Sequence, residues 1–162
     1  MRALRHLFAT PLGTRRRFDA VVLGAIESAI VAAERRTSGE IRFAIETALD
    51  IDDLRSGKPP RDRALEVFSE LRVWDTELRN GVLIYVLMAD RDVEIVADRG
   101  AAQRIPPEDW ENACRLVEEH FRNGRFQQGS VAGVAAVGAL LEEHFPARAV
   151  ERNEQPDLPA VL

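Results

Sequence analysis

Two groups of polar residues in this chain have the types and spacing needed to bind an ion. The first group stands before and after a pair of apolar segments and comprises Asp75, Thr76, Glu77, Arg79, Asn80, Asp98 and Arg99. The second comprises the acids Asp50, Asp52, Asp53, Asp90 and Asp92. Carboxylate and carbonyl oxygens are the ligands that Ca²⁺ and Mg²⁺ prefer. Either group could therefore hold a divalent cation, with Asp75 and Asp98 or Asp90 and Asp92 as ligands. We favour the plainer interpretation, in which these acids form solvated turns and cap helices.

Two apolar segments decide which of these polar residues can meet. Residues 81–89 are apolar at almost every position, which is typical of a strand buried on both faces. Residues 93–97 follow after the turn-forming sequence Asp90-Arg91-Asp92, so the two strands are predicted to form a hairpin. The second strand then returns toward the start of the first, which places Asp98 and Arg99 near residues 75–80.

A third strand is predicted over residues 40–47, where apolar residues alternate with polar or small ones. A helix over residues 61–71 would connect it to strand 81–89, and such a crossover makes the two strands parallel. Gly39 and Glu40 then join the edge formed by residues 75–80 and 98–99. The second group of acids falls at the opposite edge.

The remaining spacing predicts helices that cover this sheet. Apolar residues recur at helical intervals over 19–37, 106–124 and 126–145, whereas 48–60 is expected to be a loop. This order predicts an α/β fold, a three-layer α/β/α sandwich with a small mixed sheet of three or four strands and helices on both faces. We expect a basic leader over 1–17, the domain over 18–146 and an extended tail over 147–162.

Composition and charge narrow the classes of function. The chain has 162 residues, 46% of them apolar, and a single cysteine, Cys114, which is expected to be a core residue. Without a signal peptide or an apolar run long enough to span a bilayer, the sequence predicts a cytoplasmic protein. The net charge of −5 combines five arginines in residues 1–17 with an excess of ten acids in the rest of the chain. An acidic body argues against nucleic acid as a partner.

The leader suggests contact with the inner face of a membrane. It interleaves Leu4, Leu7, Phe8 and Leu12 with Arg2, Arg5, Arg15, Arg16 and Arg17. Basic residues next to an anionic lipid surface are each worth about 1 kcal/mol. The interpretation we favour for the leader is nevertheless a solvated segment, because Pro11 and Gly13 are expected to break any helix there.

Several short motifs resemble the TPM domain family, which takes its name from a thylakoid lumen protein, a photosystem II protein and a modulator of an acetylcholine receptor. They are Ser38-Gly39-Glu40-Ile41, the run from Asn80 to Val86, the run from Asp90 to Ile95, Gly100, and the late pattern Phe121, Gly124, Phe126 and Gly129. The resemblance covers residues 20–146 and is closest to a short bacterial branch that lacks a signal peptide and a membrane helix. It implies an α/β/α sandwich.

The resemblance implies two kinds of function. A plant member is assigned acid phosphatase activity and calcium binding, whereas other members look like accessory domains of membrane complexes. Many members carry Asp where this chain has Arg79, and a guanidinium removes an oxygen ligand and adds a fixed positive charge. Arg79 and Arg99 would then suit an anion.

We therefore favour a non-catalytic interaction module that binds a protein partner near membrane proteins. The alternative is a phosphatase acting on phosphomonoesters that depends on Ca²⁺ or Mg²⁺. In that case Asp75 and Asp98 would hold the metal, and Arg79 or Arg99 would bind the phosphate.

Overall fold

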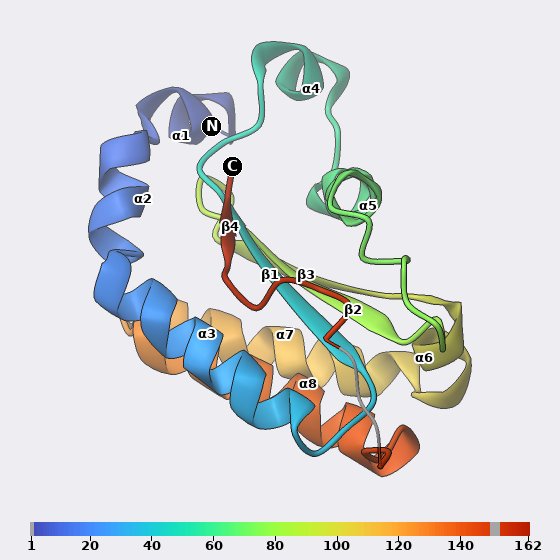
Figure 1. Ribbon diagram of the computed structural model, residues 1–162. Coiled ribbons are helices and arrows are strands. Elements are labelled where there is room, and N and C mark those ends of the chain that lie inside the picture. Colours follow the sequence, from blue (N-terminus) through green and yellow to red (C-terminus); the bar gives the residue numbers. More distant parts are fainter. Residues whose placement is uncertain (1, 150–152) are drawn as a thin grey trace.

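The computed structural model describes residues 2–149 and 153–162 and has a four-stranded mixed sheet at its centre (Figure 1). The strand order is β3-β2-β1-β4, with bounds β1 Glu40–Glu46, β2 Gly81–Leu87, β3 Asp92–Ala97 and β4 Ala160–Val161. The β1 and β2 strands are parallel, with Glu40 opposite Gly81, whereas β3 is antiparallel to β2. The predicted hairpin and the predicted parallel pair are both confirmed.

Helices lie on both faces of the sheet, which confirms the predicted sandwich. Figure 1 shows α3, α7 and α8 beneath the sheet and α4 and α5 above it. The helices are α1 Arg2–Phe8, α2 Pro11–Arg17, α3 Ala20–Glu34, α4 Ile51–Ser56, α5 Pro60–Glu70, α6 Arg99–Arg104, α7 Pro107–Arg122 and α8 Phe126–His144. No helix within the described ranges is long and apolar enough to cross a bilayer.

The side chains of β1 point alternately to the two faces of the sheet, where they belong to two separate core clusters. Ile41, Phe43 and Ile45 face the larger cluster, which α3, α7 and α8 complete, while Ala44 faces the smaller cluster beneath α5. The α7 and α8 helices pack so closely that a Cβ atom at Gly133 would lie 2.4 Å from Cγ2 of Val117. A side chain at Gly133 would therefore force the two helices apart.

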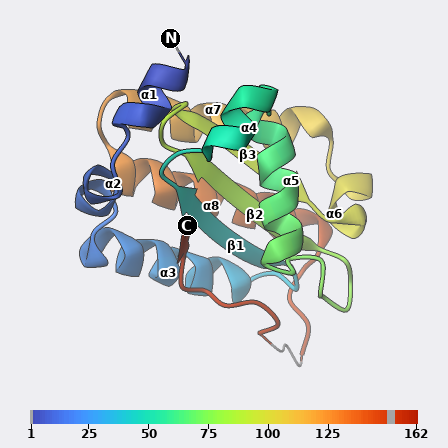
Figure 2. The ribbon, with the colours of Figure 1, turned by 90° about the horizontal axis from the view of Figure 1, so that it is seen from above.

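The C-terminal segment binds along the outer edge of β1 (Figures 1 and 2). The carboxylate of Glu40 accepts hydrogen bonds from the backbone N–H groups of Glu154 and Gln155, each at 3.1 Å. Arg42 donates to the carbonyl oxygens of Pro156, at 2.6 Å, and Leu158. These contacts bury Glu40 and Arg42, and the chain then pairs with β1 as β4. The extended tail thus supplies the fourth strand.

Two expectations about local structure need correction. The leader leaves helical structure between Phe8 and Pro11, but Pro11 then occupies the first turn of α2, where proline is well tolerated, and Gly13 lies inside α2 with its N–H capped by the Thr10 hydroxyl at 3.1 Å. The predicted loop over 48–60 contains α4, whose first turn is capped by Asp50 through the N–H of Asp53 at 2.8 Å. Side-chain caps of this kind are worth about 1 kcal/mol, enough to stabilise a short helix.

Candidate functional site

The structure brings the first group of polar residues together at the edge where β1 and β2 begin and β3 ends. The N–H of Gly100 donates to the carbonyl of Arg79 at 2.8 Å, and the N–H of Asp98 donates to the carbonyl of Gly81 at 2.9 Å. The side-chain amide of Asn80 donates to the carbonyl of Ser38 at 2.8 Å, which joins the α3–β1 turn to the same edge. We call this set of residues 75–80 and 98–99 the polar edge.

Much of the polar edge serves to hold the backbone. The hydroxyl of Thr76 accepts the N–H of Asn80 at 3.2 Å, and both residues are buried. A Cβ atom at Gly100 would lie 2.5 Å from the carbonyl oxygen of Leu78, so the two loops approach as closely as glycine allows. The exposed members are Asp75, Glu77, Arg79 and Arg99.

Asp98 caps the N-terminus of α6. Its carboxylate accepts the N–H of Arg99 at 2.7 Å. Because Asn is as good an N-cap as Asp, we expect Asp98→Asn to leave the free energy of unfolding almost unchanged and Asp98→Ala to lower it by about 1 kcal/mol. Urea unfolding of the two variants tests this. An Asn variant as unstable as the Ala variant would contradict the capping role and point to a role that needs the charge.

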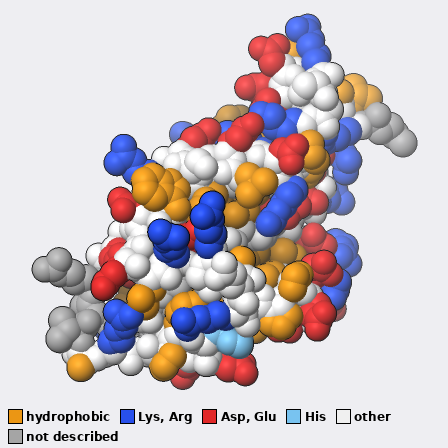
Figure 3. All heavy atoms as spheres, turned by 90° about the vertical axis from the view of Figure 1, so that its right-hand side faces the viewer, with side chains coloured by type: hydrophobic (Ala, Val, Ile, Leu, Met, Phe, Trp, Pro, Cys, Tyr) orange, Lys and Arg blue, Asp and Glu red, His pale blue; other side chains and the backbone are white. Residues whose placement is uncertain are grey.

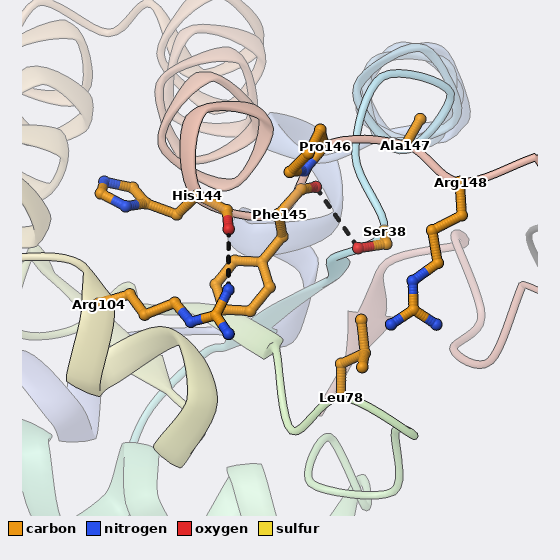
Figure 4. Close-up of a pocket in the computed structure, with 8 residues that line it drawn as sticks. All are labelled: Ser38, Leu78, Arg104, His144, Phe145, Pro146, Ala147 and Arg148. Carbon is orange, nitrogen blue, oxygen red and sulfur yellow. Dashed lines mark hydrogen bonds between the residues drawn. The ribbon is translucent and has the colours of Figure 1, made fainter.

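A small pocket of about 290 Å³ lies next to the polar edge, between the end of α8 and the α3–β1 turn (Figure 4). Arg104 and Arg148 enter it from opposite sides, with Ser38 and Leu78 between them. Arg104 donates to the carbonyl of His144 at 3.1 Å and its guanidinium lies 4.6 Å from the ring centroid of Phe145. The described lining contains no acid, but Arg148 already lies 3.8 Å from the carboxylate of Glu77.

The face that carries α6 combines arginines with the exposed acids Asp75 and Glu77. Figure 3 shows Lys and Arg side chains across the middle of this face, with Asp and Glu side chains mainly nearer its borders. The exposed arginines of the segments that meet here are Arg72, Arg79, Arg99 and Arg104.

The second group of acids is dispersed among structural roles. Asp90 is bound by the N-terminal helices: Arg2 lies 2.8 Å away, the His6 imidazole 3.0 Å and Arg5 3.8 Å. Burial disfavours its charge, but the hydrogen bonds from Arg2 and His6 outweigh burial and hold the pKa of Asp90 below its usual range. Burial raises the pKa of Asp92 to about 6.

The three remaining acids of the second group lie on α4 or cap it. Asp50 caps the helix, Asp52 is exposed, and Asp53 lies 2.5 Å from Lys58. Within residues 2–149 and 153–162, no three His, Cys, Asp or Glu side chains are grouped so that they could hold a metal ion.

The N-terminal helices dock on the domain through polar side chains, which the sequence analysis missed. The Nδ1 atom of His6 accepts the N–H of Leu49 at 3.0 Å while Nε2 faces Asp90, and the hydroxyl of Thr14 lies 3.0 Å from that of Thr47. Both His6 and Thr14 are almost fully buried. Arg2 and His6 stand four residues apart and so share one helix face, a spacing that could have signalled this docking.

The apolar side chains of these two helices point outward instead. Leu4, Leu7, Phe8 and Leu12 are 56%, 75%, 77% and 59% exposed. Arg15, Arg16 and Arg17 are exposed on α2. We call Leu4, Leu7, Phe8, Leu12, Arg15 and Arg16 the outer face. Arg2 and Arg5, expected to face a membrane, turn toward Asp90.

The fold and the sequence comparisons together define the class of protein. The architecture is an open α/β sandwich with a mixed sheet. A model of the TPM domain matches residues 17–140, and the chain belongs to this family. Among solved structures, it is similar to the BA42 protein of the psychrophilic bacterium Bizionia argentinensis, with 34% identity, a TM-score of 0.77, and 88% of this chain and 94% of that chain covered.

A second structure, the N-terminal domain of a protein from P. gingivalis, shares the fold. Its TM-score is 0.58 at 21% identity, with 80% of this chain and 82% of that chain covered. No curated protein matched the sequence. The family match begins at residue 17, so the whole outer face lies outside it.

Proposed function

We propose that the protein is a non-catalytic interaction module whose outer face contacts an anionic membrane surface, where it works beside membrane proteins. The observation that carries this proposal is that α1 and α2 bury polar side chains against the domain and expose apolar ones. These helices dock with His6 and Thr14 and leave large apolar side chains in contact with water. Contiguous exposed apolar side chains of this kind mark an interaction site.

The charge of the outer face favours an anionic lipid surface as the occupant. Residues 1–17 contain five arginines and no acid, and Arg15 and Arg16 are exposed beside Leu12 on α2. Apolar side chains flanked by arginines can enter the boundary between headgroups and acyl chains while the guanidinium groups remain with the phosphates.

Co-sedimentation with vesicles tests the proposal. We expect the full chain to sediment with phosphatidylcholine vesicles that contain 30% phosphatidylglycerol, and to be released by high salt because surface charges are screened. The double variant Arg15→Gln, Arg16→Gln should bind about 30-fold more weakly, given about 1 kcal/mol for each arginine. Leu7→Ser should also weaken binding, because it removes apolar surface that would enter the bilayer boundary.

Two matched controls report whether the outer face is responsible. Leu65 on α5 is 46% exposed, and Arg115 on α7 forms an exposed ion pair with Glu111, so neither belongs to the outer face. Leu65→Ser and Arg115→Gln should bind as the natural chain does. Equal loss of binding in the controls, or no sedimentation of the natural chain at low salt, would overturn the proposal.

A second proposal keeps the phosphatase alternative; its support is that Asp98, Arg79 and Arg99 belong to one edge of the sheet, where the N–H of Gly100 donates to the carbonyl of Arg79. It predicts turnover of a phosphomonoester that is sensitive to EDTA and is abolished by Asp98→Asn, the variant that preserves the cap. Turnover that survives this substitution would contradict a metal role for Asp98.

A further inference from the structure

A groove of about 650 Å³ lies between the N-terminal helices and the turn that joins α7 to α8. Figure 2 shows α1 and α2 beside that turn. The volume falls within the range of roughly 300–1,000 Å³ that small-molecule sites occupy. Phe8 and Gly13 line the side formed by α1 and α2, and Met88 lines the side formed by the end of β2.

Arginines surround this groove. Arg5, Arg17, Arg91 and Arg122 line it, whereas Glu118 is the lining acid. Glu118 already lies 3.3 Å from Arg122, and Arg5 is 3.8 Å from Asp90, which lies outside the lining. Arg91 is exposed at the tip of the β2–β3 hairpin, where its φ of +56° fixes the turn. The excess of three positive charges in the lining selects an anion.

Aromatic and thioether side chains supply an apolar surface in the same groove. The rings of Phe121 and Phe126 lie 5.0 Å apart between centroids, and Phe18 contacts both from the core, at 6.0 Å and 5.7 Å. The guanidinium of Arg17 lies 5.6 Å from the ring centroid of Phe126. A ligand held here therefore meets a fixed apolar surface and a guanidinium at the same point. A small inorganic anion would leave the apolar surface unused.

We infer that this groove binds a single-chain anionic amphiphile, with its alkyl chain against Met88, Phe121 and Phe126 and its anionic head among Arg5, Arg91 and Arg122. A fatty acid and a lysophospholipid share this chemistry. The inference goes beyond contact with a bilayer surface, because it concerns one bound molecule. Phe8 is the member of the outer face that also lines the groove, so variants at Leu7, Arg15 and Arg16 test the bilayer contact without changing the lining.

Displacement of the fluorescent probe 11-(dansylamino)undecanoic acid from the full chain tests the inference. We expect the probe to bind and dodecanoate, below its micellar concentration, to displace it. Affinity should rise about fourfold for each added methylene from octanoate to dodecanoate while the groove fills. The neutral amphiphile dodecyl maltoside and inorganic phosphate should each compete at least tenfold more weakly than dodecanoate.

Variants and a second head group complete the test. Arg122→Gln combined with Arg91→Asn, where Asn tolerates the positive φ, should weaken probe binding at least tenfold, and Arg115→Gln should not change it. Dodecyl phosphate that displaces the probe more strongly than dodecanoate would point to a lysophospholipid source, and the reverse would point to a fatty acid. Unchanged binding in the folded double variant, affinity that does not depend on chain length, or equal competition by dodecyl maltoside would overturn the inference.

Discussion

Replacing Arg42 by Met is expected to detach the C-terminal segment from β1 and to lower the free energy of unfolding by about 3 kcal/mol. Arg42 is 9% exposed and donates hydrogen bonds to the carbonyls of Pro156 and Leu158. Met keeps the apolar stem but removes both bonds, and a hydrogen bond that involves a charged group contributes about 1.5–3 kcal/mol. Urea unfolding measures the loss. Hydrogen exchange at Leu162, whose N–H donates to Ile45 at 2.9 Å, reports detachment directly.

A matched arginine on the surface provides the control. Arg36 forms an ion pair with Glu142 at 3.0 Å in which both side chains are about half exposed. Such a pair contributes about 0–1 kcal/mol, so Arg36→Met should change the unfolding midpoint little. If Arg42→Met unfolds at the same urea concentration as Arg36→Met, the role assigned to Arg42 is wrong.

The second large effect is a loss of stability as pH rises, caused by buried acids beside the C-terminal segment. Burial is the main cause that raises the pKa of Glu34 to about 9 and that of Glu40 to about 7. The negative charge of Asp157 also raises both pKa values. The folded chain therefore holds protons that the unfolded chain releases at ordinary carboxyl pKa values near 4.5. By linkage, the stability is fully present below about pH 4.5 and is lost as pH rises toward 9.

Glu34→Gln tests this cause, because Gln imitates the protonated carboxyl and can still accept the N–H of Ile41, which lies 2.7 Å from Glu34. At pH 9 we expect the variant to be more stable than the natural chain by several kcal/mol, because a shift from 4.5 to about 9 at 1.36 kcal/mol per unit sets an upper bound of about 6 kcal/mol. At pH 5 the two should melt almost together. The exposed Glu119→Gln is the control. A natural chain whose melting temperature is constant from pH 5 to 9 would contradict the prediction.

The central sheet could be predicted from the sequence because its signals are local. The apolar run of β2, the Asp90-Arg91-Asp92 turn and the alternation of β1 fix the hairpin and the parallel pair. These in turn place Asp98 near Arg79, as the hydrogen bond from Gly100 to Arg79 bears out. Backbone pairing alone therefore predicts which polar residues reach this edge, and their side-chain contacts are not needed for the prediction.

The two chain ends could not be predicted in the same way, because long-range polar contacts position them. β4 is only two residues long, and its pairing depends on Glu40 and Arg42, which lie more than 110 positions earlier in the chain. Similarly, the docking of α1 depends on His6 reaching Leu49 and Asp90. Hydrophobic periodicity contains no information about such contacts.

The docking of α1 and α2 is what makes the outer face a surface of defined shape. An undocked leader could fold its apolar side chains inward. The contacts of His6 and Thr14 instead hold Leu4, Leu7 and Leu12 in water. The free energy that would be recovered when these side chains leave water is available for binding.

Fluorescence from position 7 tests the proposed contact of the outer face with a membrane most directly. An environment-sensitive dye would be attached at Leu7→Cys in a Cys114→Ser background, and anionic vesicles would then be added at low salt. We expect a blue shift from the dye at position 7 and none from the same dye at position 65, because only position 7 would enter the bilayer boundary. No shift at position 7 in a chain that sediments with the vesicles, or equal shifts at both positions, would contradict it.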